Sequence, residues 1–457
     1  MIFELLNSRT MAPFAGVPGP KPIFPFGNLL DFVGKTKRPW EVFASYGNRY
    51  GGMSLTWMFN YPSIVLNDAK LIEQILISRT KDFYKDEPCG ALIPVLTRSS
   101  PNILNGEEWT DARTQSPFMQ SWAIEWQRAQ LPHVRQRLRQ SAEHLATASS
   151  AEPIPLQLDL QRTTFDAFSI ATMGRELPDA AYKDFIALAT LGSNRMLAPW
   201  RPSKDLNAAG QSLQKRFQQT LRDYCSEAKN QGAEHPFDLL SLTLQHHSQI
   251  PPEALASEMG NVFYGGCFSV PSTLVSTLYL LNQNPHEKVR LVQAIDALGP
   301  DFDCDSLLAC KPLDYALREG MRLLPAVPLF SRRVLPNTST ELGGIHLPPN
   351  TNIWICHWLL QRSSPHWDDP LTYTPDRWGG GIAESNPLGS DYFAPEGRGP
   401  RMCLGADYSI FYMKLVLATW LSEWEIDCGR GQPYDAGQDF FFGVRMPWGL
   451  KASFRKR

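Results

Sequence analysis

The chain has 457 residues, and 43% of them are hydrophobic, which is enough apolar material for a large buried core. Its 44 Lys and Arg against 46 Asp and Glu give a net charge of -2, which excludes a global attraction to nucleic acid or to anionic lipid. Eight scattered cysteines without a C-x-x-C pair argue against a disulfide framework and a zinc ribbon, and favour a reducing compartment, the cytoplasm.

The N-terminal residues begin with a short apolar stretch that Glu4, Asn7 and Arg9 interrupt before it reaches the length of a membrane span. This pattern predicts neither a membrane anchor nor a signal peptide. No Pro/Gly-rich linker divides the rest of the chain. We therefore expect an N-terminal lead with a Pro-rich hinge over residues 1–20, followed by one domain over residues 21–457.

The pattern of residue types predicts a mainly α fold with smaller β regions. Turn residues separate two β-branched and aromatic segments at 50–58 and 61–68, which indicates an early sheet. Helical patterns dominate from about Leu71, for example over 126–148 and over 240–285, where a break is expected near "QIPPEA". Strands are expected again within 332–355 and 446–457, with a hairpin turn at Gly343-Gly344.

The stretch "EGRGPRMCLGADYS" places Cys403 among glycines and beside Arg398 and Arg401. Positive charge and exposed backbone N–H groups lower the pKa of a thiol, so this surrounding favours the thiolate. A thiolate is the form of cysteine that reacts or binds metal. The alternative is an ordinary core cysteine beside a turn.

Four upstream segments accompany this stretch: "EEWTDAR", "YGGCFSVPSTLVSTLYLL", "LREGMRLLPAVPLFSRRV" and "PHWDDPLTYTPDRW". Together they make the chain resemble the cytochrome P-450 superfamily of haem-thiolate enzymes, from about Pro18 to the C-terminal strands. The resemblance implies a large P-450-like helical domain with haem b buried between central and proximal helices. It implies that Cys403 is the iron ligand, with Gly399, Arg401 and Gly405 at the surrounding loop positions.

The resemblance also implies a buried ion network made of Glu319, Arg322 and Arg377. Glu319 and Arg322 are three residues apart, so they lie on one face of a helix, and the apolar run that follows favours burial. A surface pair at the same spacing is the alternative. We expect this network to serve folding rather than chemistry.

Haem propionates are carboxylates and need cationic or N–H donors. The family's positions for these donors fall on Trp109, Arg113, Arg333 and Arg401. Trp109 and Arg113 are four residues apart, which places them on one helical face. The alternative for this pair is a core tryptophan and a solvated arginine.

Two positions depart from the family's pattern. The central helix reads Gly265, Gly266, Cys267, Phe268, Ser269, so the alcohol is kept as Ser269 while Phe268 replaces the usual acid of the proton relay. Pro271 removes a helical N–H just beyond. We assign Gly266, Phe268 and Ser269 to the catalytic segment. The second departure is Glu396, which stands where an aromatic residue is usual.

Three functions follow, in decreasing order of preference. The first is a monooxygenase that hydroxylates or epoxidises a lipophilic small molecule, of the kind made in secondary metabolism, with O2 and electrons from a separate ferredoxin, flavodoxin or reductase. The second is a haem-thiolate peroxygenase, isomerase, dehydratase or oxidative-coupling enzyme, because such chemistry needs no acid-alcohol relay. The third is a non-catalytic haem sensor.

The resemblance places the substrate chamber among mostly apolar segments, which indicates a lipophilic substrate. It also places electron delivery at the face that carries Arg398 and Lys414, whose charges would attract an acidic partner. The chamber segments are residues 89–104, 188–200, 263–269, 325–330 and 439–444.

Overall fold

The computed structural model describes residues 12–23, 25–33, 38–59, 61–85, 100–116, 119–120, 123–197, 204–231, 237–379, 392–434, 437–441 and 443–457. These residues cluster into two compact units. The first unit takes its residues from 1–87, 322–372 and 381–403, and the second takes them from 88–321, 373–380 and 404–457. Each unit is built from segments that are distant in the sequence.

The first unit contains a mixed sheet with the strand order β1-β2-β8-β5-β3. β1 and β2 are antiparallel, β2 and β8 are parallel, and β5 is antiparallel to both β8 and β3. In β2 the run from Ile64 to Leu66 is fully buried, as expected for a strand with both faces covered. The strands are β1 (Met53–Met58), β2 (Tyr61–Leu66), β3 (Phe83–Tyr84), β5 (Leu329–Val334) and β8 (Asn352–Cys356).

A separate hairpin of this unit joins β6 (Thr340–Leu342) to β7 (Ile345–Leu347). Its two turn residues, Gly343 and Gly344, have φ angles of 58° and 77°. Two consecutive residues with positive φ form the tight turn that matches the twist of a hairpin. The predicted hairpin turn and the early sheet are therefore confirmed.

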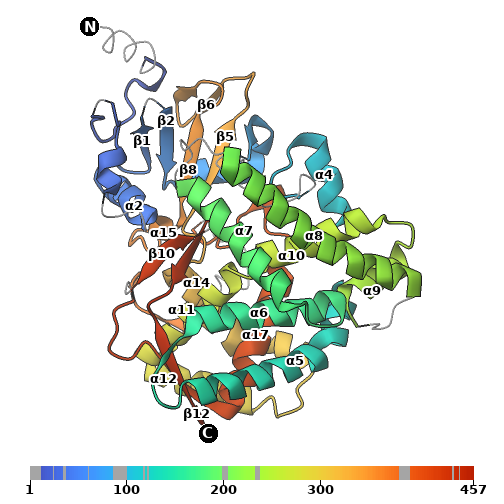
Figure 1. Ribbon diagram of the computed structural model, residues 1–457. Helices are drawn as coiled ribbons and strands as arrows, with labels where there is room; N and C mark the ends of the chain where they lie inside the picture. The colour runs from blue at the N-terminus through green and yellow to red at the C-terminus, as the bar shows by residue number, and fades with distance from the viewer. Residues whose placement is uncertain are drawn as a thin grey trace. The chain divides into compact units, whose positions relative to one another are not determined.

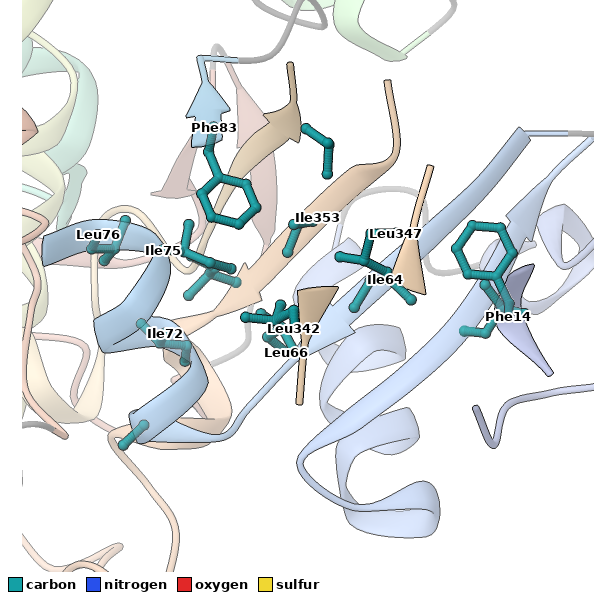
Figure 2. Close-up of a cluster of buried hydrophobic side chains, with 14 of the residues drawn as sticks. Phe14, Ile64, Leu66, Ile72, Ile75, Leu76, Phe83, Leu342, Leu347 and Ile353 are labelled. Atoms are coloured by element: carbon teal, nitrogen blue, oxygen red, sulfur yellow. The ribbon is translucent and has the colours of Figure 1, made fainter. Parts of the chain in front are cut away.

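The core of the first unit lies between this sheet, the hairpin and a short helical segment (Figure 2). Ile72, Ile75 and Leu76 come from the helical segment, and Leu342 and Leu347 come from the hairpin. The helices of the unit are α2 (Pro39–Tyr50), α3 (Ala69–Glu73), the π turn η3 (Gln74–Ser78) and α15 (His357–Leu360), with 3-10 turns η1 (Ala12–Phe14), η2 (Leu29–Phe32), η4 (Thr80–Asp82) and η8 (Gly399–Arg401).

The second unit is mainly helical, which confirms the predicted fold class. α7 packs beside α8, and α8 packs beside α10 (Figure 1). The helices are α4 (Gly106–Gln115), α5 (Ala123–Ala148), α6 (Leu156–Met173), α7 (Asp179–Leu197), α8 (Lys204–Gln231), α9 (Leu239–His246), α10 (Pro252–Gly266), α11 (Ser269–Gln283), α12 (Pro285–Asp296), α13 (Cys304–Ala309), α14 (Lys311–Leu323), whose last two residues belong to the first unit, η7 (Pro375–Gly379) and α17 (Ala406–Glu423).

Two small sheets complete the second unit. β12 lies between β4 and β9, and β10 pairs with β11, all antiparallel. Their bounds are β4 (Ile154–Pro155), β9 (Trp424–Cys428), β10 (Gln438–Phe441), β11 (Val444–Pro447) and β12 (Lys451–Lys456). The helices that the structure describes include none with the length and hydropathy of a bilayer span.

The predicted helix after "QIPPEA" is not continuous. It breaks at Cys267 and Phe268, so that α10 ends at Gly266 and α11 begins at Ser269. Pro271 explains the break, because it has no N–H to donate to the carbonyl of Cys267 and its ring would collide with that carbonyl. The turn therefore sits immediately before the one alcohol of the catalytic segment.

Candidate haem-thiolate site

Cys403 follows the short 3-10 turn η8 in the first unit. Its backbone N–H donates to the carbonyl of Glu396 at 2.9 Å, and the N–H of Met402 donates to the carbonyl of Gly399 at 3.0 Å. These two hydrogen bonds fix the backbone of the loop between residues 396 and 403. Cys403 is exposed, whereas the other cysteines in the described part of the chain are buried. The alternative of an ordinary core cysteine is therefore wrong, and the sulfur is accessible to a ligand.

Gly399 holds this loop against η3. Its φ is +69°, and a Cβ added there would lie 2.0 Å from the carbonyl oxygen of Leu76. Both the backbone conformation and the close approach require glycine. Gly405 differs, because its φ is -90° and nothing lies within 4 Å of an added Cβ. The described surroundings therefore explain why glycine is required at position 399, but they give no reason for glycine at position 405.

A buried histidine, which the sequence did not suggest, lies beside the loop. His357 begins α15, is fully buried, and packs its ring 4.3 Å from that of Phe330. Burial and the positive charges of Arg332 and Arg398 lower the pKa of His357 to about 3. Neither ring nitrogen has a hydrogen-bond partner among the described residues. A lone histidine after a strand gives no sequence signal for this arrangement.

The four predicted propionate donors lie in two groups. In the second unit, the guanidinium of Arg113 lies 5.9 Å from the ring centre of Trp109, which confirms that they share one face of α4. In the first unit, Arg333 on β5 donates through Nε to the carbonyl of Asn350 at 3.1 Å. Arg401 in η8 is half-buried. Guanidinium groups suit carboxylates, so these residues match the chemistry that haem requires.

Glu319 is the centre of a buried polar cluster in the second unit. Its Oε1 accepts the Nε–H of Arg377 at 2.9 Å and the backbone N–H of Thr374 at 3.0 Å. Its Oε2 accepts the indole N–H of Trp378 at 3.0 Å. The predicted burial of Glu319 is therefore confirmed, and the surface-pair alternative is wrong.

Arg322, one helical turn after Glu319 on α14, is also fully buried. Its Nη1 donates to the carbonyls of Gln361 at 2.8 Å and Pro370 at 2.7 Å, and its Nη2 donates to the carbonyl of Thr372 at 3.2 Å. Arg322 therefore holds the backbone of 361–372. This is a structural role, as the sequence predicted.

The residues of the catalytic segment, Gly266, Phe268 and Ser269, have different surroundings. Phe268 is 1% exposed and stacks on Phe185, with ring centres 5.2 Å apart. Gly266 faces Phe168, whose ring would lie 2.3 Å from an added Cβ. Ser269 is half-buried, and its hydroxyl donates to the carbonyl of Gly265 at 2.9 Å. Ser269 is therefore the accessible polar side chain of the three.

The predicted pair of exposed charges for electron delivery is wrong. Arg398 is 9% exposed and Lys414 is 3% exposed. The ammonium of Lys414 donates to the carbonyl of Leu308 at 2.8 Å, and burial lowers its pKa. A charged partner cannot reach either side chain directly.

Part of the predicted substrate chamber lies outside the described residues. This applies to residues 89–99 of the first wall segment, to 198–200 of the second and to Phe442. Among the described wall residues, Val327, Phe330, Phe440 and Phe441 are apolar and remain half-buried.

Comparisons with known proteins identify the family. The family model described as Cytochrome P450 matches residues 17–444. Cytochrome P450 3A5 of Homo sapiens is 22% identical over 464 residues, which cover 91% of this chain and 87% of that protein. The (13S,14R)-13-O-acetyl-1-hydroxy-N-methylcanadine 8-hydroxylase of Papaver somniferum is 28% identical over 47% of this chain and 41% of its own length.

Cytochrome P450 monooxygenase orf6 of Eupenicillium brefeldianum is 28% identical over 38% of this chain and 36% of its own length. The last two matches thus span less than half of each relative. The donor set agrees with the family's cofactor, because it offers an accessible cysteine sulfur for iron and guanidinium groups for carboxylates. The chain belongs to the cytochrome P450 family, and it is a haem-thiolate monooxygenase whose cofactor is haem b.

Proposed function

We propose that the protein hydroxylates or epoxidises a lipophilic small molecule with O2, using electrons from a separate redox partner. The observation that carries the proposal is the accessible sulfur of Cys403 in a loop whose backbone is fixed against η3. When haem b is bound through this thiolate, the ligand supplies electron density that favours O–O cleavage. The remaining steps depend on the protein's own side chains.

The side chains that would hold the cofactor carboxylates are those of Trp109, Arg113, Arg333 and Arg401. Guanidinium donors form charge-assisted and often paired hydrogen bonds with carboxylates. Packing of Arg113 on the Trp109 ring restricts the arginine before any ligand arrives, which lowers the entropy lost on binding. This preorganisation supports the assignment of the pair.

Ser269 would hold the proton needed for oxygen activation. Its O–H donates to the carbonyl of Gly265, so the lone pairs of Oγ remain available to accept a hydrogen bond or a proton from water. Phe268, which stands at the family's acid position, can do neither. Ser269 therefore takes the proton from water rather than from its neighbour in the sequence.

The half-buried apolar residues Val327, Phe330, Phe440 and Phe441 support a lipophilic substrate, since ligand pockets are lined mostly by apolar and aromatic groups. The printed name of the Papaver somniferum relative describes hydroxylation of a canadine derivative, which supports hydroxylation as the class of reaction. Phe268 stands at the family's acid position and packs on Phe185, so no acid is present there. This favours a second candidate, a peroxide-driven enzyme, because such an enzyme needs no acid relay.

The test uses the purified holoprotein. A lipophilic library is first screened for compounds that shift the Soret band, and the hits are incubated either with a reductase system and O2 or with peroxide alone. We expect an oxygenated product with the reductase system and at most a trace with peroxide. Equal product with peroxide alone would favour the second candidate and overturn the use of a redox partner.

A further inference from the structure

One face of α10 carries accessible polar residues that lead toward Ser269. Between residues 255 and 264, Glu258 and Asn261 are the two residues that are not buried, and Gly265 beyond them is exposed. The spacing of three and then four residues returns to one face of a helix. Glu258, Asn261 and Gly265 therefore lie on one face of α10, and the hydroxyl of Ser269, the first residue of α11, donates to the carbonyl of Gly265 at 2.9 Å.

The space over this face is open at Gly265. Among the described residues, no heavy atom lies within 4 Å of a Cβ added to Gly265, whereas a Cβ on the neighbouring Gly266 would meet Phe168. The Nδ2 of Asn261 has no hydrogen-bond partner among the described residues. An open space with polar groups at both ends is where ordered water resides. Asn261 and the Ser269 hydroxyl provide these polar groups.

Glu258 is the carboxyl group that can donate a proton to such water. In residues 252–283 the acidic residues are Glu253 and Glu258, and Glu253 lies more than a full turn farther from Ser269. Burial raises the pKa of Glu258 to about 7. A general acid works best when its pKa lies near the operating pH.

Within the described residues, no charged group shifts the pKa of Glu258. The α10 positions one turn from Glu258 are Ala254, Leu255, Asn261 and Val262, and none of them titrates. From α6, α8 and α11, the helices packed on α10, no charged side chain shifts the Glu258 pKa. Burial is therefore the main cause of the raised pKa of Glu258.

We propose that Glu258 is the proton donor that replaces the acid missing at position 268, and that water held by Asn261 over Gly265 carries the proton to Ser269. A rise of 1.5 Å per residue separates Glu258 from Gly265 by about 10 Å along α10, so water must bridge the gap. The Glu258 carboxyl gives a proton to the water, the water passes one to Oγ of Ser269 while the hydroxyl releases its own proton toward the oxygen being reduced, and solvent reprotonates the Glu258 carboxylate. The inference rests on the proposed function, because it takes Ser269 as the end of the path.

The test compares Glu258→Gln with Glu258→Asp, with Gly265→Leu, which fills the open space, and with the control Glu253→Gln on the exposed end of the same helix. Product and released peroxide are measured per electron consumed across pH 5.5–8.5. Glu258→Gln and Gly265→Leu should lower product per electron by about 10²-fold, the low end of what a positioned proton donor contributes. Glu258→Asp should retain part of the coupling, and Glu253→Gln should retain all of it.

Wild-type coupling should fall as the pH rises through about 7, because the donor is then deprotonated, and Glu258→Gln should lose this dependence. Infrared difference spectra of the holoprotein give a readout independent of activity: a protonated carboxyl band should titrate near pH 7 and be missing from Glu258→Gln. A band that titrates near the ordinary value of a glutamate, or coupling unchanged in Glu258→Gln, would overturn the role of Glu258 even if Ser269→Ala uncouples. A wild type that forms product from peroxide alone would instead overturn the proposed function.

Discussion

The carboxylate of Glu319 accepts the Nε–H of Arg377 at 2.9 Å, and no part of Glu319 reaches solvent. The carboxylate also accepts the backbone N–H of Thr374 and the indole N–H of Trp378. Both oxygens of this buried carboxylate accept hydrogen bonds. Removing one partner would leave the remaining polar groups buried without a hydrogen bond and without water, which destabilises the fold.

We therefore expect Glu319→Ala to lower the free energy of unfolding by about 3–5 kcal/mol, the usual cost of leaving a buried charge without its partner. Denaturant titration of the purified holoprotein measures this loss. The control is Arg128→Ala, which breaks an ion pair with Asp305 whose side chains are 52% and 65% exposed. That change should cost far less, because exposed ion pairs add little to stability. Equal losses in the two variants would contradict the buried cluster.

Gly399→Ala should disrupt the cysteine loop, whereas Gly405→Ala should not. An added Cβ at Gly399 meets the Leu76 carbonyl oxygen at 2.0 Å in a backbone with φ of +69°. At Gly405 the φ is -90°, and no atom of the described residues lies within 4 Å of an added Cβ. The haem content per chain and the Soret position of the reduced carbon monoxide complex measure the loop directly. Normal spectra for Gly399→Ala would show that the loop shifts away from η3 at little cost.

The sequence pattern predicted those helices, strands and turns that are determined by neighbouring residues in the chain. The hairpin at Gly343-Gly344, the strands β1 and β2 and the long helix α5 follow from turn residues and periodicity, and all three are present. The break between α10 and α11 was missed, because Pro271 was read only as the loss of one helical N–H and not as a clash with the carbonyl four residues earlier.

Burial of charged groups was predictable only where a motif accompanied it. Glu319 came with a recognisable spacing, whereas Lys414 and Arg398 looked like surface charges and proved to be buried. Their burial depends on partners from elsewhere in the chain, such as the carbonyl of Leu308, and no local pattern encodes such a partner. Glu258 did carry a signal, its helical spacing of seven from Gly265, which composition alone did not highlight.

Phe268→Asp, which restores the acid usual in this family, should destabilise the protein rather than improve its coupling. The side chain at this position is 1% exposed and packs on Phe185 and Phe441. A carboxyl placed among these rings loses its hydration without gaining a partner, at a cost of several kcal/mol, roughly 2–7 for an uncompensated polar group. Phe268→Leu, which keeps an apolar side chain, is the control. A lower thermal midpoint for the aspartate variant alone checks the prediction, and higher product per electron would contradict it.

His357 should make the protein less stable as the pH falls below about 6.5. Burial and the charges of Arg332 and Arg398 lower its folded-state pKa to about 3, below its ordinary value of 6.5. Between these values the unfolded chain binds a proton that the folded chain does not, so the free energy of unfolding decreases as the pH falls through this window. Asp238 and Glu258 have pKa values raised to about 7, so they act in the opposite direction.

A comparison of wild type with His357→Phe isolates the histidine, because the raised carboxyls are present in both proteins. The difference in unfolding free energy between them should change by about 1.4 kcal/mol per pH unit at most, with the wild type losing more as the pH falls from 6 to 4. Arg398→Ala should narrow this window, because removing a neighbouring positive charge raises the pKa of His357. Denaturant titrations at several pH values measure all three proteins. Parallel curves for wild type and His357→Phe would mean that the folded protein already protonates His357, against the buried neutral imidazole described above.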